Sequence, residues 1–151
     1  MEKQIMKQDC ANQKRAQPRF KEITEPAMAG RKSKVLLVED NTSLLLGLMV
    51  SMKGKGIEVV SAVTKEEAVK AFAENKDITL VITDISYPEK QGVEQSHESG
   101  LSFIRHVKDM RPELKVIAQS SSKEYLEMAA QAGADGEVKK IDLMGWINSK
   151  G

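Results

Sequence analysis

The stretch that decides the fold is LVITD at residues 80–84, an apolar and β-branched run that closes in Asp84. An earlier apolar run, VLLV at residues 35–38, closes in the same way with Glu39 and Asp40. Short continuous runs of this kind indicate strands buried on both faces, as in a parallel sheet. Such sheets bind ligands in the crevice at the carboxyl ends of their strands. We therefore expect three carboxylates to meet in an acidic pocket centred on Asp84, where clustered negative charges favour a hard divalent cation.

Strand and helix patterns alternate along the chain from Lys34 onward. The expected strands cover residues 35–38, 57–62, 78–82, 116–118 and about 136–138. Apolar residues at helical spacing follow each of them, around residues 44–52, 64–72, 101–110, 121–132 and 142–149. This order predicts an α/β domain with a doubly wound, five-stranded parallel sheet and helices on both faces.

Polar residues between these segments indicate how the helices begin. The tetrapeptides TKEE at residues 64–67 and SSKE at residues 121–124 have the form of a capping box, in which a hydroxyl and a carboxylate satisfy free amides at a helix start. Residues 89–99 are polar and are expected to form a long loop before the third helix. Gly133 is expected to end the fourth helix.

The bulk composition limits the partners and the location of the protein. Residues 1–33 hold eight Lys/Arg and four Asp/Glu, and their chain breakers and lack of period indicate a flexible N-terminal extension. Residues 34–151 hold fifteen Lys/Arg and eighteen Asp/Glu, and this acidic domain argues against nucleic acid as a partner. Cys10 is the single cysteine, no signal-peptide pattern opens the chain, and no apolar run reaches the roughly 18 residues of a membrane span. The sequence therefore predicts a soluble cytoplasmic protein with no membrane partner.

Five sequence features stand in a fixed order at the ends of the expected strands. They are the acid pair Glu39 and Asp40, the turn from Asp84 to Pro88, Ser120, the segment GADG at residues 133–136, and Lys140. Together they resemble the receiver domain of two-component response regulators, over about residues 34–148. The resemblance implies a flavodoxin-like sheet with strand order 2-1-3-4-5. On this basis we expect residues 34–151 to form a receiver domain.

The resemblance implies that Mg²⁺ is bound as a cofactor. Asp40 and Asp84 would bind the cation through their carboxylates, and Ser86 would bind it through its backbone carbonyl. Glu39 would act through a water molecule, because Mg²⁺ keeps part of its hydration shell in proteins.

The resemblance also implies phosphoryl chemistry at Asp84. This carboxylate would attack the phosphorus of a phosphohistidine and form an aspartyl phosphate. Lys140 would pair with one phosphoryl oxygen, and the Ser120 hydroxyl would donate to another. The implied partners are a sensor histidine kinase or a phosphotransfer protein, and a downstream protein target. Catalysis would be limited to self-catalysed phosphoryl transfer and autodephosphorylation, so no conventional enzyme is expected.

Three departures from the family pattern bear on signalling. An insertion at residues 89–99 moves the glycine that usually opens the third helix to Gly100. Glu137 stands three positions before Lys140, where the family usually has an aromatic residue, and a Glu fills an apolar pocket only at a cost. Ile141 stands where a proline usually follows the Lys, and a cis bond before a non-proline costs about 3 kcal/mol.

Several assignments stay open at this point. Glu39 and Asp40 would also serve as a helix cap, because Asp is a good N-cap. Ser120 belongs to a run of three serines that blurs the register, and Lys139 competes with Lys140 for the same role.

The leading prediction is a single-domain receiver that accepts a phosphoryl group on Asp84 and signals by docking to another protein. The alternative is a pseudo-receiver, an interaction module with little or no phosphorylation-dependent switching, and the insertion, Glu137 and Ile141 motivate it. A flavodoxin-like enzyme or cofactor binder is disfavoured, because acids and not a Gly-rich phosphate loop follow the first strand.

Overall fold

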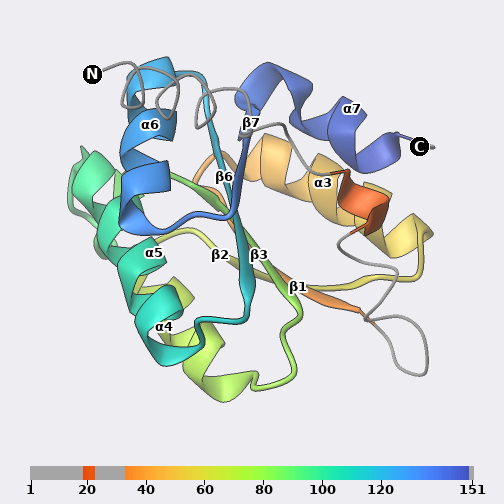
Figure 1. The fold of residues 1–151 in the computed structure, drawn as a ribbon, viewed down its shortest axis with the longest axis horizontal. Helices are drawn as coiled ribbons and strands as arrows, with labels where there is room; N and C mark the ends of the chain where they lie inside the picture. The colour runs from red at the N-terminus through yellow and green to blue at the C-terminus, as the bar shows by residue number, and fades with distance from the viewer. Residues whose placement is uncertain (1–18, 23–32, 150–151) are drawn as a thin grey trace, which may run out of the picture.

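A five-stranded parallel sheet forms the centre of the molecule (Figure 1), in a computed structural model that describes residues 19–22 and 33–149. Its strands are β1 (Lys34–Val38), β2 (Glu58–Ala62), β3 (Leu80–Asp84), β6 (Lys115–Ser120) and β7 (Gly136–Lys139). They lie in the order β2-β1-β3-β6-β7, and every neighbouring pair is parallel. Counted along the sheet strands alone, this is the order 2-1-3-4-5, so the predicted fold class is confirmed.

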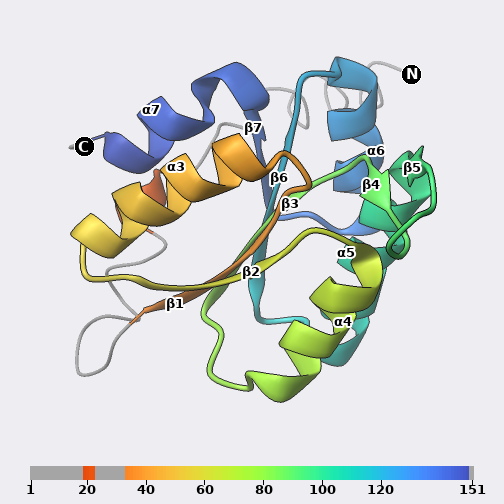
Figure 2. The same ribbon diagram turned by 180° about the vertical axis from the view of Figure 1, so that it is seen from behind.

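Helices cover both faces of the sheet, as Figures 1 and 2 show from opposite sides. On one face lie α3 (Thr42–Gly54) and α7 (Leu143–Asn148). On the other face lie α4 (Lys65–Glu74), α5 (His97–Met110) and α6 (Lys123–Ala132). A 3₁₀ turn, η1 (Lys140–Asp142), joins β7 to α7. This double covering explains why β3 is buried at all five positions and reads as an unbroken apolar run up to its acid.

Alternate residues of each central strand enter two separate cores. In β1, Leu36 and Val38 pack into the core that contains Phe72 of α4 and Phe103 of α5. Val35 and Leu37 pack into the second core, on the side of α3 and α7. Both strand faces are therefore anchored, so the residues that follow β1 have a fixed position.

The boundaries of several elements differ from the sequence prediction. The third strand begins at Leu80, two residues later than the expected Ile78, and it runs to Asp84 as expected, because Thr83 and Asp84 still pair with β6. Thr64 caps α4 by accepting a hydrogen bond from the Glu67 amide, as predicted. The predicted capping box that starts at Ser121 is wrong by one residue, because Ser122 is the N-cap and accepts from the Tyr125 amide. Gly133 ends α6 in the left-handed conformation, with φ of 114°.

The insertion folds as a short β-hairpin, so the prediction of a loop is confirmed for residues 89–94 and wrong for residues 95–99, which form a strand and the start of a helix. Strand β4 (Tyr87–Pro88) pairs with β5 (Gln95–Ser96) in an antiparallel arrangement beside α5 and α6 (Figure 2). Helix α5 then begins at His97, four residues before its first large apolar residue, because the Ser96 hydroxyl accepts a hydrogen bond from the Glu98 amide. We call residues 87–96 the hairpin.

Gly100 closes the base of the hairpin. Its amide donates to the Ile85 carbonyl at 3.0 Å, and a Cβ at this position would overlap that carbonyl group. Because only glycine allows this approach, the start of α5 lies directly against the turn after β3. Helix α5 packs on the sheet directly after the hairpin, with Phe103 in the same core as Leu36.

The predicted extension, residues 1–33, lies outside the described residues except for positions 19–22 and 33. Within that short described piece, Phe20 is 3% exposed and meets Trp146 of α7 edge to face, with 5.3 Å between ring centroids. Across the described ranges, no helix combines the length and the apolar character that crossing a bilayer requires.

Candidate functional site

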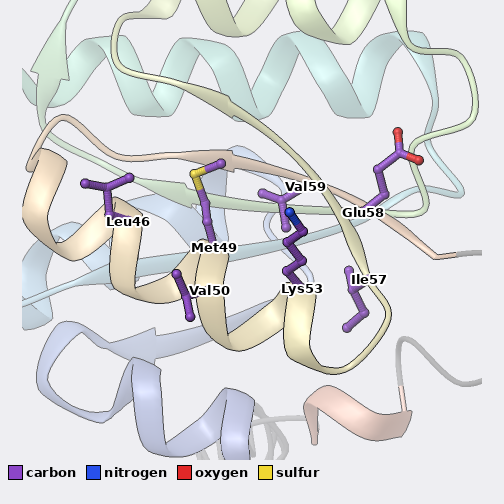
Figure 3. A pocket seen from close by; sticks show the side chains of 7 residues that line it. All are labelled: Leu46, Met49, Val50, Lys53, Ile57, Glu58 and Val59. Atoms are coloured by element: carbon purple, nitrogen blue, oxygen red, sulfur yellow. The ribbon is translucent and has the colours of Figure 1, made fainter.

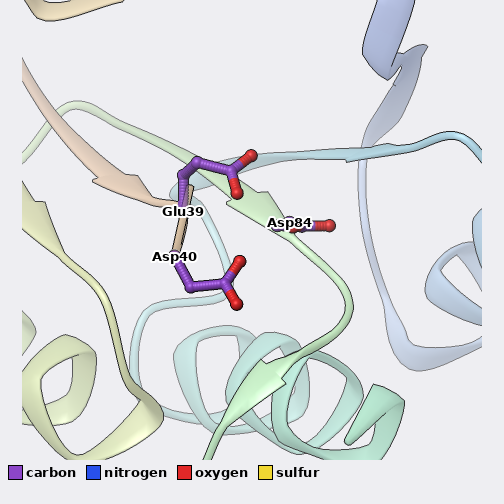
Figure 4. A group of neighbouring side chains, drawn as sticks. All are labelled: Glu39, Asp40 and Asp84. Carbon is purple, nitrogen blue, oxygen red and sulfur yellow. The ribbon is translucent and has the colours of Figure 1, made fainter. Parts of the chain in front are cut away.

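Three carboxylates converge at the carboxyl edge of the sheet. Glu39 and Asp40 follow β1, and Asp84 ends β3. The two strands are hydrogen-bonded neighbours in parallel register, so their ends lie side by side. One oxygen from each of the three carboxylates falls within 4.8 Å of the others, and Figure 4 shows the side chains turned toward a common space. The expectation that the three acids meet is confirmed.

Glu39 is the buried member of the group, with none of its surface exposed. Its Oε1 accepts a hydrogen bond from Gln119 Nε2 at 2.7 Å, and Lys140 Nζ lies 3.3 Å from the same oxygen. Its Oε2 accepts from the Asn41 amide at 3.0 Å. Three donors from three parts of the chain therefore hold this carboxylate, which explains how a charge can be buried here.

Sequence reasoning missed Gln119. It is completely buried in β6 and stands opposite Asp84 in the register of the sheet. Its Oε1 has no hydrogen-bond partner among the described residues, so its amide group is oriented by Glu39 alone. The available signal was a polar side chain at the end of an otherwise apolar strand, directly before Ser120.

Asp84 is only 5% exposed and uses both of its oxygens. Oδ1 accepts a hydrogen bond from the Ile85 amide at 2.7 Å, and Oδ2 accepts from Lys140 Nζ at 3.1 Å. The backbone is also fixed, because the Thr83 hydroxyl donates to the Asp84 carbonyl at 2.7 Å. This carboxylate is therefore held in one orientation at the mouth of the sheet.

Lys140 supplies the positive charge of the site. It follows β7, and its ammonium group lies between Asp84 and Glu39. Burial lowers the pKa of Lys140, but the charges of Asp84 and Glu39 outweigh that effect, and the net pKa stands above the usual lysine value. Lys139, the competing candidate, is exposed on β7, so of the two lysines Lys140 is the one that reaches the acids.

Asp40 is the partly exposed member of the group, and it contacts the hairpin. Its Oδ2 accepts a hydrogen bond from Gln95 Nε2, which the sequence did not reveal as a site residue. Burial raises the pKa of the Asp40 carboxyl and the charge of Glu39 adds to the rise, whereas the hydrogen bond from Gln95 acts in the opposite direction. Neither acid caps α3, because the Asn41 side chain accepts from the Leu44 amide and is the N-cap.

A pocket of about 200 Å³ opens above the acids. Its lining includes Asp40, Asp84, Ser86, Gln95, Ser120 and Lys140. Ser120 ends β6, is 4% exposed, and accepts a hydrogen bond from the Ser122 amide at 3.0 Å. The residues singled out in the sequence are therefore gathered at one place, since Glu39 belongs to the same three-acid cluster as Asp40 and Asp84.

The charge of this site suits a divalent cation. Three carboxylates and one ammonium leave two negative charges uncompensated within a few ångströms. The donors on offer are carboxylate and hydroxyl oxygens, which hard cations such as Mg²⁺ prefer. The residues present therefore fit Mg²⁺, the cofactor that the sequence resemblance implies.

A second, larger pocket has a different character. It measures about 430 Å³ and lies between α3 and β2 (Figure 3). Apolar side chains such as Leu46, Met49 and Val50 form most of its wall, and its charged groups are Lys53 and Glu58. It therefore lacks the clustered carboxylates of the acidic pocket.

Comparison with known proteins identifies the family. Residues 35–143 match the family model described as "Response regulator receiver domain". This chain belongs to the response regulator receiver family. A solved receiver domain from Methanospirillum hungatei JF-1 is 28% identical, covers 78% of this chain and 91% of that one, and superposes with a TM-score of 0.63. A receiver domain from Clostridium thermocellum is 26% identical, with 77% and 91% of the two chains covered and a TM-score of 0.62.

A curated relative is a longer protein. The alkaline phosphatase synthesis transcriptional regulatory protein PhoP of Bacillus subtilis (strain 168) is 28% identical over 107 residues. The match covers 71% of this chain but only 42% of PhoP, so this chain spans less than half of that relative.

Two departures from the receiver pattern take definite positions in the structure. Glu137 is half-buried in β7, opposite Ala118 of β6, where receivers usually carry an aromatic side chain. Ile141 is 88% exposed in the 3₁₀ turn, and no peptide bond in the described part of the chain is cis. Lys140 thus reaches the acids by way of a 3₁₀ turn without a cis bond after it.

Proposed function

We propose that this receiver accepts a phosphoryl group on Asp84 from a histidine kinase or a phosphotransfer protein, and signals by docking to a downstream protein. The observation that carries the proposal is the placement of Asp84. Its carboxylate is fixed by Lys140 at 3.1 Å, belongs to the three-acid cluster, and borders the pocket. A nucleophile, a counter-charge and space for a phosphoryl group are thus available in one place.

The chemistry requires little movement of this chain. An oxygen of Asp84 attacks the phosphorus, the phosphorus–nitrogen bond of the donor histidine breaks, and the imidazole leaves with the bonding electrons and takes up a proton from solvent. The transferring group spreads negative charge over its oxygens, so catalysis consists mainly of positioning and charge neutralisation. Lys140 would then pair with a phosphoryl oxygen, and the Ser120 hydroxyl would rotate to donate to another.

Mg²⁺ completes the proposed site. Asp40 and Asp84 would hold it through carboxylate oxygens and Ser86 through its backbone carbonyl, while Glu39 would act through a water molecule. Bound there, the cation would supply positive charge to the phosphoryl oxygens during transfer. The indirect role for Glu39 agrees with its burial and with the three donors that already occupy it.

The proposal is tested by incubating the protein with Mg²⁺ and acetyl phosphate and measuring its intact mass. Wild type is expected to gain the mass of one phosphoryl group, and chelation of Mg²⁺ should abolish the gain. Asp84→Asn removes the nucleophile and is expected to stay unmodified. Asp109→Asn makes the same change at an exposed acid on α5 and should behave as wild type. An unmodified wild type, or equal modification of Asp84→Asn, would refute the proposal.

A further inference from the structure

The hairpin is fastened to elements on several sides of the acidic pocket. The Glu89 carbonyl accepts a hydrogen bond from the Glu66 amide in the first turn of α4, at 2.9 Å. Directly after the hairpin, at the first residue of α5, the ring of His97 stacks on Tyr125 of α6, with 5.0 Å between ring centroids. Tyr87 is completely buried, and its hydroxyl lies 3.3 Å from the Thr83 hydroxyl. The hairpin therefore has a defined position at the mouth of the pocket.

Gln95 extends from the hairpin to the acids. Its Nε2 donates to Oδ2 of Asp40, a residue 55 positions earlier in the sequence, and both side chains line the pocket. Glu39 and Asp84 take their donors from the sheet ends, from Lys140 and from adjacent backbone amides. Asp40 is thus the acid that the insertion reaches.

The negative charges around Asp40 explain what this hydrogen bond contributes. Glu39 is adjacent in sequence and Asp84 is close in space, so like charges act to turn the Asp40 carboxylate away from the cluster. An N–H donor on the pocket side opposes that rotation. The donor is neutral, and a carboxylate offers about four lone-pair sites, so capacity for a cation remains. A lysine in the same place would instead neutralise the negative charge that attracts the cation.

We propose that Gln95 is a positioning residue of the cation site: it holds the Asp40 carboxylate in the orientation in which the three acids converge, and thereby strengthens Mg²⁺ binding. The inference rests on the proposed function in so far as Mg²⁺ is the cation. It gives the insertion a role inside the site. Hydrogen-bond partners that orient metal ligands in this way generally affect affinity strongly.

The direct test measures Mg²⁺ binding to the unmodified protein by isothermal titration calorimetry. Gln95→Ala is expected to weaken binding about three- to tenfold, less than for a buried partner of a ligand because Gln95 is exposed. Gln91→Ala is the matched control: the same substitution in the same hairpin at another exposed residue, with unchanged affinity expected. Thermal unfolding in a chelator should show that all three proteins stay folded, with a loss of less than about 1 kcal/mol for Gln95→Ala. An affinity for Gln95→Ala equal to or tighter than that of wild type would overturn the proposal.

A second measurement separates positioning from a general structural role. When phosphorylation by acetyl phosphate is followed against Mg²⁺ concentration, Gln95→Ala should raise the half-saturating concentration about three- to tenfold. The rate at saturating Mg²⁺ should stay close to that of wild type, because Asp84 and Lys140 are untouched. A lower rate at saturation with an unchanged half-saturating concentration would reject the assignment. If wild type is not phosphorylated at all, the proposed function fails, while calorimetry still decides the role of Gln95.

Discussion

Two glutamines donate to the two acids after β1, and they do so in opposite surroundings. Gln119 and Glu39 are both completely buried and joined by a 2.7 Å hydrogen bond between core elements. Gln95 is exposed on the hairpin, and its partner Asp40 is partly exposed. The donor and acceptor groups are the same in the two contacts. The difference indicates that Glu39 belongs to the buried scaffold of the fold, whereas Asp40 can change its contacts at the surface.

Burial decides how much each contact matters to the fold. If a buried carboxylate loses a donor, no water replaces it, and the desolvation cost of the charge remains. If an exposed carboxylate loses a donor, water takes its place and the net change is small. We therefore expect substitutions around Glu39 to lower stability, and substitutions around Asp40 to alter binding and pH dependence instead.

The largest expected effect comes from a substitution at the base of the hairpin, which carries the exposed glutamine Gln95. Gly100→Ala places a Cβ where it overlaps the Ile85 carbonyl, so the start of α5 must move away from the turn after β3. We expect a loss of about 3 kcal/mol in the free energy of unfolding, measured by urea denaturation. Gly145→Ala is the control, because its Cβ would meet nothing within 4 Å and helical alanine is favoured over glycine. A loss below about 1 kcal/mol for Gly100→Ala would contradict the close packing described here.

The next effect tests the surroundings of Glu39, the buried acid of the two that follow β1. Lys140→Met removes the ammonium between Glu39 and Asp84 and leaves two nearly buried carboxylates uncompensated. Loss of one partner from a buried ion pair costs about 3–5 kcal/mol, but the Lys140 side chain is 32% exposed. Discounted for solvent, the expected loss is about 2 kcal/mol in urea denaturation at neutral pH with a chelator.

Lys139→Met is the control for that experiment. It makes the same substitution one residue earlier, on an exposed side chain of β7, and should change stability by less than about 0.5 kcal/mol. Equal stability of Lys140→Met and Lys139→Met would show that Glu39 and Asp84 do not depend on the lysine.

The sheet and the position of the acids were predictable because they follow from local patterns. Strands buried on both faces read as apolar runs, and an acid that closes such a run must lie at the carboxyl edge. The partners of the two glutamines were not predictable, because the partner of a polar side chain is determined only in the folded structure. Two-residue strands such as β4 and β5 show no period, so the hairpin looked like a loop. Among three adjacent serines, Ser122 is the N-cap of α6 in the folded structure, and the local sequence pattern does not distinguish it from Ser121.

The smallest expected effect concerns Asp40, the partly exposed acid, and is measured as the dependence of stability on pH. Burial and the charge of Glu39 raise the pKa of Asp40 in the folded protein above its ordinary value of 3.8, and Gln95 opposes the rise. The folded state therefore binds this proton more tightly than the unfolded state. The resulting stabilisation is present below the ordinary pKa and is lost as pH rises through the raised pKa. Asp40→Asn carries no titrating carboxyl and does not undergo this loss.

In urea denaturation with a chelator, Asp40→Asn should therefore gain stability relative to wild type as pH rises from about 4 through the raised pKa of Asp40, by less than about 1 kcal/mol. Gln95→Ala keeps the Asp40 carboxyl but removes the donor that lowers its pKa, so it should lose more stability than wild type over the same range. Gln91→Ala should follow wild type at every pH. A stability difference between Asp40→Asn and wild type that stays constant with pH would mean that the folded structure does not perturb Asp40, and that the hairpin contact leaves its charge unaffected.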